Sequence, residues 1–259
     1  MKISLWLWVV ALVVAALAAR YQRTTGPTVP ITGEAALGAA TFRYSLPRTH
    51  AGDGDQKVDI RPGAGDAEGV LEWQLLGAGD AWTRVPMRRE GESLRADLPH
   101  QPMTGKLAYR VTLARGDARL TLPARHPAVI RFRGDVPPAV LLPHILAMIA
   151  ALLLGARGAL EVFNRPPRFR GLTDGTLAAL LVGGFVLGPL VSWYAFHAPW
   201  GGFPLGNDPT DNKTLLAFLV WLAAAIAVRR AKRPGPWVVF AALVMFAVYL
   251  VPHSISMPR

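Results

Sequence analysis

Five long apolar stretches constrain the fold of this chain more than any other feature. They run over residues 3–19, 139–156, 176–196, 214–228 and 236–251. A helix that crosses a bilayer needs about 20 predominantly apolar residues, with about 17 as the lower limit. The second and third stretches meet this length, and the last two reach it when each is extended by a turn. We therefore expect a membrane protein with four or five spanning helices.

The first stretch permits two interpretations, which the sequence leaves open. Lys2, the apolar run and the small residues around Ala18 are typical of a secretory signal peptide with its cleavage site. Trp6 and Trp8 equally suit the interfacial belt of an uncleaved anchor. Residues 1–19 are thus an N-terminal transmembrane anchor or a signal peptide, and in both cases the segment that follows is exported.

The basic residues of the short loops predict the orientation, because cytoplasmic loops are enriched in Lys and Arg. Two loops hold eight of them: Arg157, Arg165, Arg168, Arg170, Arg229, Arg230, Lys232 and Arg233. The loop over 197–212 has Asp208 and Asp211 and no Lys or Arg. We expect this loop, the C-terminus and the domain after the first stretch on the outer side of the membrane, which is the periplasmic side if the membrane is a bacterial inner membrane.

The formal net charge of +11 does not indicate nucleic-acid binding. Residues 20–137 hold 17 basic and 13 acidic side chains, and the cytoplasmic loops carry much of the remaining excess. Insertion topology and contact with anionic lipid explain those loop charges. A nucleic-acid footprint requires a concentrated basic face, and the linear sequence has none.

Residues 20–137 have a different pattern, in which short alternating runs are separated by Gly, Pro and Asp. The runs cover residues 40–46, 57–60, 69–76, 82–87, 93–98, 106–113, 119–122 and 128–132. Seven or eight short strands without a helical period predict an exported antiparallel β-sandwich of the immunoglobulin or fibronectin-III type. We expect Trp73 and Tyr109 in its core. Residues 138–259 then form a four-helix transmembrane domain, which makes the chain an α+β membrane protein.

Two polar segments of the expected sandwich are interpreted as turns. The segment over 51–55 has the Gly and Asp content of a calcium loop but lacks the bidentate acid that an EF-hand requires. A solvated hairpin turn explains its composition better. The charged segment over 88–92 is likewise expected to form a hairpin tip.

Four segments carry a resemblance to a protein family. They are YQRTTGPT at 21–28, LPHQP at 98–102 with GKL at 105–107, FPLGND at 203–208 with TDNKT at 210–214, and VPHS at 251–254. They resemble the signature segments of bacterial multi-pass membrane proteins that pair an exported fibronectin-III-like domain with a small helical bundle. The resemblance implies this architecture and a location in the bacterial envelope, and it implies no activity.

Histidines at the ends of three spans are the candidate ligands of a metal or haem. His144, His197 and His253 all fall on the expected outer face, near Asp208 and Asp211. Three imidazoles suit zinc or copper, and two suit axial haem ligation. The alternative is structural, with interfacial histidines, Asp208 as the N-cap of a helix, Pro209 as its first residue and Asp211 as an acid in its first turn.

Catalytic motifs are missing from the sequence. There is no cysteine, no G-x-S-x-G motif and no Walker or dinucleotide-binding glycine motif. The glycines and proline over 183–189 interrupt the third span, but without a second, repeated break they do not indicate a transporter.

Two functions follow from the sequence. The first is a non-catalytic envelope protein, whose sandwich binds a protein or glycan partner while its bundle sits in the lipid bilayer and anchors it or docks a membrane subunit. The alternative is a redox or metal- or haem-binding membrane protein that uses the span-end histidines. No cofactor is firmly implied.

Overall fold

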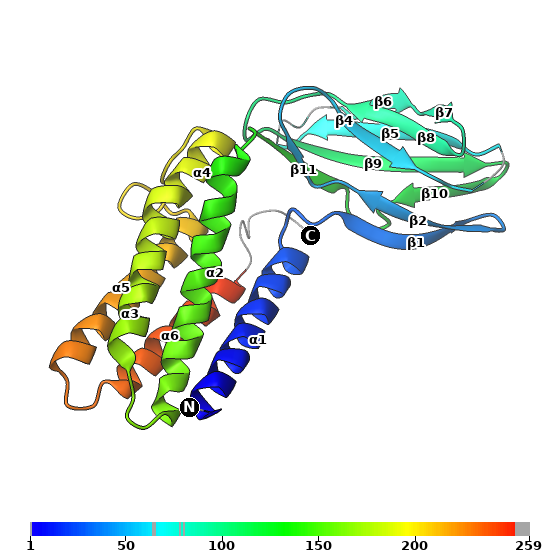
Figure 1. Ribbon diagram of the computed structural model, residues 1–259. Helices are drawn as coiled ribbons and strands as arrows, with labels where there is room; N and C mark the ends of the chain where they lie inside the picture. Colours follow the sequence, from blue (N-terminus) through cyan, green and yellow to red (C-terminus); the bar gives the residue numbers. More distant parts are fainter. Residues whose placement is uncertain (1, 64–65, 78, 80, 252–259) are drawn as a thin grey trace. The chain divides into compact units, whose positions relative to one another are not determined.

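The structure is a computed structural model that describes residues 2–63, 66–77, 79 and 81–251. It is an α+β chain with two compact units (Figure 1). Among the described residues, Pro27–Asp135 form one unit, made of strands, and residues 2–26 and 136–251 form the other, made of helices.

The helical unit contains these elements: α1 (Lys2–Thr25), α2 (Pro138–Leu160), η1 (Glu161–Phe163), α3 (Phe169–Leu180), η2 (Leu181–Leu187), α4 (Gly188–Phe196), α5 (Pro209–Arg230) and α6 (Gly235–Leu250). Within the residues that the structure describes, four continuous helices are long and apolar enough to cross a membrane: Ser4–Thr25, Pro138–Phe163, Phe169–Phe196 and Pro209–Arg230. The last helix, α6, is apolar but has only 16 residues, which is about 24 Å of helix against a hydrocarbon core of about 30 Å.

Small residues on α2 let two other helices approach it closely. The ring of Trp221 from α5 lies 3.0 Å from the position that a Cβ atom would take at Gly155, and Met245 from α6 fills the same space. Trp221 is fully buried, and its Nε1 donates a hydrogen bond to Sδ of Met245 at 3.2 Å. Close approach at small residues is the usual way for helices to pack where water supplies no driving force between them.

The third long helix contains a π-helical turn, η2, in its middle. The N–H of Gly188 donates to the carbonyl of Gly183, a bond of five-residue spacing. Pro189 follows immediately, and proline has no N–H to donate to the carbonyl of Phe185. The wider turn accommodates this proline without ending the helix, so the break that the sequence predicts over 183–189 is a π-turn.

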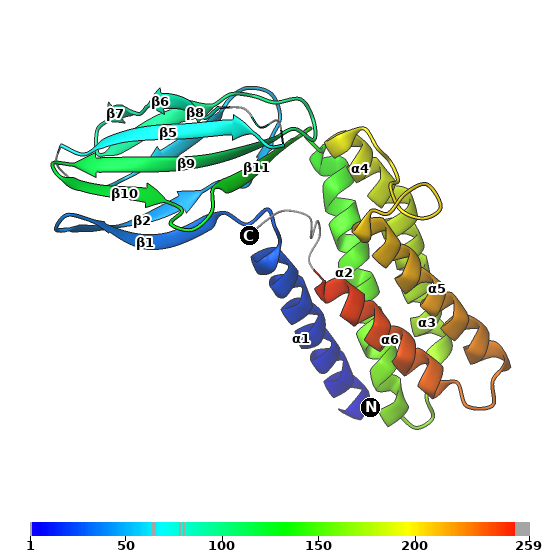
Figure 2. The same ribbon diagram turned by 180° about the vertical axis from the view of Figure 1, so that it is seen from behind.

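The described part of the strand unit has eleven strands: β1 (Ile31–Leu37), β2 (Ala40–Leu46), β3 (Thr49–Ala51), β4 (Gln56–Ile60), β5 (Glu68–Leu75), β6 (Thr83–Pro86), β7 (Arg88–Glu90), β8 (Ser93–Leu98), β9 (Lys106–Arg115), β10 (Ala118–Leu122) and β11 (Ala128–Arg133). They form a β1–β2 hairpin, a three-stranded sheet in the order β4–β8–β7, and a six-stranded sheet in the order β3–β11–β9–β5–β6 with β10 also on β9 (Figures 1 and 2). All pairs are antiparallel except β3 with β11.

All three sheets contribute to a single apolar core. It contains Leu46 from the hairpin, Ile60 from the three-stranded sheet and Leu113 from the six-stranded sheet. Tyr109 is fully buried in this core, as the sequence predicts, and its hydroxyl donates to the carbonyl of Pro47 at 2.7 Å. Trp73 is partly buried and packs against the same core.

Three of the eleven strands lie outside the runs that the sequence predicts. They are β1, β3 and β7, and the prediction of seven or eight strands is therefore too low. The segment over 88–92 is only in part a hairpin tip, because Arg88–Glu90 pair with β8 before the turn.

Candidate functional site

His144, one of the three span-end histidines, has a hydrogen-bond partner within the bundle. Its Nδ1 lies 2.9 Å from the carbonyl oxygen of Gly183 on η2. The same oxygen accepts the N–H of Gly188, so His144 supports the π-turn from the neighbouring helix. This contact engages one ring nitrogen and leaves the other for a further partner.

His197 lies at the C-terminal end of α4. Its backbone has φ 54° and ψ 25°, the left-handed conformation of a helix C-cap, and its N–H donates to the carbonyl of Trp193. The imidazole stacks on the Trp193 ring, with 5.4 Å between centroids. The position thus has a structural role at the end of the helix.

The two aspartates organise the loop between α4 and α5. Asp208 is the N-cap of α5 and accepts hydrogen bonds from the N–H groups of Thr210 and Asp211, as the sequence predicts. Asp211 reaches back to accept the N–H of Gly201 at 2.6 Å, and Asn212 accepts the N–H of Phe203 at 2.7 Å. These bonds fold the loop against the start of α5 and use the carboxylates for backbone donors.

Within the described ranges, no three His, Cys, Asp or Glu side chains form a group that could hold a metal ion. His253 lies outside those ranges. The proposal that His144, His197 and His253 share a ligand with the aspartates therefore stays a prediction.

A different candidate emerges on the outward face of the six-stranded sheet. Strand pairing places directly opposite residues on the same face, and the register assigns six basic side chains to this face: Arg84, Lys106, Arg110, Arg119, Arg131 and Arg133. Only Glu68 and Glu72 oppose them among the acidic residues of these strands. We call this set of residues the basic face.

The other sheet shows that this excess is local. The corresponding face of β4–β8–β7 carries three basic and three acidic side chains: Lys57, Arg88, Arg95, Asp59, Glu90 and Asp97. Arg95 there bonds both Asp59 and Glu90. On that sheet the basic and acidic side chains are equal in number, whereas on the basic face the six basic side chains outnumber the two acidic ones.

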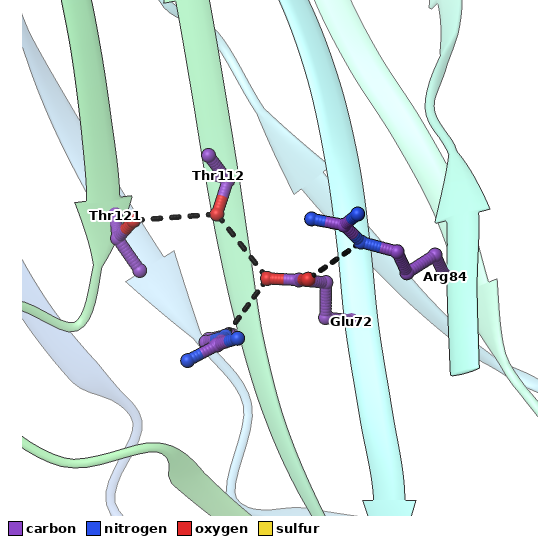
Figure 3. Close-up of polar contacts among 5 residues, drawn as sticks. Glu72, Arg84, Thr112 and Thr121 are labelled. Atoms are coloured by element: carbon purple, nitrogen blue, oxygen red, sulfur yellow. Dashed lines mark hydrogen bonds and ion pairs between the residues drawn. The ribbon is translucent and has the colours of Figure 1, made fainter. Parts of the chain in front are cut away.

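Glu72 lies at the centre of an ordered network on the basic face (Figure 3). One carboxylate oxygen accepts Nε of Arg84 from β6 at 2.8 Å, and the other accepts Nε of Arg110 from β9 at 2.8 Å. Thr112 makes a longer contact of 3.4 Å with Glu72 and lies 3.2 Å from the hydroxyl of Thr121 on β10. The network thus crosses four neighbouring strands.

Burial and charge act on Glu72 in opposite directions. Burial alone would raise its pKa, but hydrogen bonds and electrostatic attraction from Arg110 and Arg84 outweigh burial and leave the pKa below its ordinary value. The Glu72 side chain is only 4% exposed, while that of Arg84 is 73% exposed. A buried, ionised carboxylate therefore holds a guanidinium that still faces solvent.

Arg110 is fixed from a second direction. Its guanidinium carbon lies 4.6 Å from the centre of the Trp82 ring, a cation–π contact. In the described part of the chain, the hydrogen bonds of Arg84 and Arg110 all pass through Nε. Their Nη groups keep the parallel donors that bind carboxylates and phosphates in a bidentate manner.

Sequence reasoning missed this site because its charges are far apart in the chain. The strands that carry them were predicted, but which residues share a face depends on the pairing of β9 with β5, β10 and β11. Arg110 within an alternating run was the available signal, since its neighbours Tyr109 and Val111 are buried.

Comparison of the chain with protein-family models, with curated proteins and with solved structures finds no match. The function is therefore argued from the chain's own residues.

Proposed function

We propose that this protein is a non-catalytic, multi-pass protein of a bacterial inner membrane, whose exported β-sandwich binds an anionic protein or glycan partner through the basic face. The observation that carries the proposal is the contrast between six basic and two acidic residues on one sheet face and equal numbers on the other. A one-sided charge of this kind steers and orients an oppositely charged partner.

The fold is consistent with a bundle in the membrane and a separate β-sandwich outside it. Four helices of the described residues are long and apolar enough to span a bilayer, and α6, which is apolar over its 16 residues, serves as a fifth crossing. A strand unit with one apolar core spread over three sheets fits an immunoglobulin- or fibronectin-III-like sandwich. The bundle then anchors the sandwich, or docks a second membrane subunit.

The topology is tested with alkaline-phosphatase fusions, which are active only outside the cytoplasm. We expect activity for fusions near residues 100, 205 and 257 and none near 167 and 232. Activity at 167 would overturn the orientation and with it the exported position of the sandwich.

Partner binding is tested by cross-linking in cells at native expression. A photo-reactive amino acid replaces Gln74, which lies on the basic face, or Asp97, which lies on the neutral face of the other sheet. We expect a defined adduct from position 74 and none from 97. Equal yields from both positions contradict the proposal. No adduct from 74 rules out the protein partner and leaves the glycan partner, which is tested by the binding of acidic and neutral sugars.

A further inference from the structure

We infer that the guanidinium pair of Arg84 and Arg110, held by Glu72, is a carboxylate-binding site for an acidic polysaccharide that lies across the basic face. This inference rests on the proposed function and names the partner's chemistry and the residues that recognise it. Its basis is the network that Glu72, Arg84, Arg110 and Trp82 form at the centre of that face.

The two arginines are pre-organised before any ligand arrives. Each Nε is engaged by one oxygen of the same buried carboxylate, and Arg110 also packs on the Trp82 ring. Side chains that are already ordered lose little conformational entropy on binding, which favours affinity. Both side chains are in part exposed to solvent, and guanidinium Nη groups donate to carboxylates in a bidentate manner.

The spacing of the neighbouring bases suits a linear polyanion. Arg84 and Arg110 flank β5, so their backbones are about 10 Å apart, twice the distance between adjacent strands. Lys106 lies about 13 Å from Arg110 along β9 at about 3.3 Å per residue, and Arg131 is directly opposite Lys106 on β11. Successive carboxylates of a polyuronate chain can therefore meet successive cations along β9.

The character of the face favours a glycan over a protein or a lipid surface. Protein interfaces have an apolar centre rich in exposed aromatic residues, and membrane-surface binding adds buried apolar anchors to charge. In the described strand unit, the large apolar side chains that are exposed are Leu75, Leu76 and Met103. Of these, Leu76 alone borders the basic face, where its N–H donates to the carbonyl of Lys106. Threonine hydroxyls, guanidinium groups and a single indole instead match the hydroxyls, carboxylates and ring faces of sugars.

The test uses the full-length protein in detergent and measures Kd by calorimetry for hexagalacturonate and for neutral maltohexaose. We expect binding of the acidic hexasaccharide and none of the neutral one. The affinity for hexagalacturonate should fall with added salt, because each cation that pairs with a carboxylate releases a counterion. Equal affinity for the two sugars overturns the inference.

Glu72→Gln is the decisive variant, because two explanations of binding predict opposite effects for it. One is a site of aligned guanidinium groups, and the other is attraction to the overall positive charge of the face. It raises the net charge of the face by one, so simple electrostatic attraction predicts tighter binding. The inference predicts weaker binding, by about fivefold to tenfold, since the two guanidinium groups lose the carboxylate that aligns them. Unchanged or tighter binding of hexagalacturonate overturns it.

Further variants guard against a loss of folding. In Glu72→Gln/Arg84→Gln/Arg110→Gln no buried charge is left unpaired, and we expect at least about a tenfold loss of affinity with an unchanged melting temperature. Arg88→Gln removes an exposed base from the other sheet, and its Kd should equal that of the parent protein. Equal losses in both variants would show a non-specific charge effect and overturn the site.

Two more probes separate this inference from the proposed function. If inorganic phosphate or vesicles of phosphatidylglycerol compete for Arg84 and Arg110 more strongly than hexagalacturonate, the ligand is not an acidic polysaccharide. If no acidic sugar binds while position 74 still cross-links a partner, the inference fails and the proposed function stands. If position 74 gives no adduct but hexagalacturonate binds through the arginines, the sugar site stands without a protein partner.

Discussion

The guanidinium carbon of Arg157 on α2 lies 5.4 Å from the centre of the Trp8 ring on α1, and its Nη2 donates to the hydroxyl of Ser4 at 3.3 Å. Arg157 is buried and forms an ion pair with the equally buried Glu161 one turn later. The first helix thus supplies part of the environment of a buried charge on the second. A cation–π contact of this kind is worth about 2 kcal/mol when it is desolvated.

This contact predicts that α1 remains in the mature protein. A signal peptide needs no specific partner, whereas α1 also buries Ala11, Ala15 and Ala18 within the helical unit. Removing the helix would expose the surface on which these alanines pack and leave Arg157 without its contacts to Trp8 and Ser4. We expect mass-spectrometric peptide mapping of protein purified from cells to recover peptides that contain residues 4–18. A mature chain whose first residue is Ala19 would contradict the prediction.

The Arg157–Glu161 pair predicts a strong coupling in a double-mutant cycle. Removing one member of a buried ion pair leaves the other charge buried and unpaired, which costs about 3–5 kcal/mol of stability. We expect Arg157→Met and Glu161→Gln each to lower the free energy of unfolding by this order, and the double variant to lose less than the sum. Reversible unfolding in mixed micelles measures the free energies, and strict additivity would show that the two side chains do not interact.

Two glycines of α2 form a matched pair for testing the bundle core. A Cβ atom at Gly155 would lie 3.0 Å from Trp221 and collide with Met245, whereas at Gly158 the nearest atom is 3.5 Å away. We expect Gly155→Ala to destabilise the bundle by about 1–3 kcal/mol through overpacking. Gly158→Ala should be neutral or stabilising by up to about 1 kcal/mol, because alanine favours helix. Equal melting temperatures for the two variants would contradict this packing.

The helices were accessible to sequence reasoning because length and apolar content alone decide whether a segment can cross a bilayer. The π-turn was not, since it depends on Pro189 within the helix and on a hydrogen bond from His144 of another helix. The N-cap at Asp208 was predictable because it is local, requiring only a short polar side chain before Pro209.

The strands show the same division between local and distant causes. Most were visible as alternating runs, but β1 contains Gly33 and three residues of low strand propensity. The ring of Tyr44, opposite on β2, occupies the space where a Cβ of Gly33 would lie, at 2.8 Å from the ring carbon Cζ. The glycine is thus explained by a partner that only the folded hairpin reveals, and the basic face depends in the same way on register.

Glu72 predicts a pH dependence of the strand unit. Its pKa is lowered in the folded protein, below the value of about 4.3 for a free glutamate. A lowered folded pKa means that the stabilisation is complete above the unfolded pKa and is lost as the pH falls through the folded one. We expect the parent protein to lose stability below about pH 4.3, and Glu72→Gln to be less stable at pH 7 and to lose less over the same acidic range.

The chain has no cysteine, so a single introduced cysteine is the only thiol that can react. Its reaction rate therefore reports the unfolding of the strand unit. Val111→Cys places the thiol in the core of the strand unit, where the side chain is fully buried. Its rate of reaction with dithiodipyridine, measured in increasing urea at pH 7 and at pH 3, gives the stability of this unit in the full-length protein. Identical pH dependence with and without Glu72→Gln would contradict the assignment to Glu72.

Substitutions of His197 distinguish a structural role from metal binding, because the backbone conformation at this position favours glycine. With φ at 54°, an L-residue with a Cβ atom pays about 1 kcal/mol or more that glycine does not. We expect His197→Gly to be more stable than His197→Ala by about 1 kcal/mol, although both lose the stacking on Trp193. If His197 holds a metal together with other span-end residues, both variants lose that metal and its stabilisation, so both fall well below the parent protein. Melting temperatures in detergent, with elemental analysis of the parent and both variants, separate these outcomes.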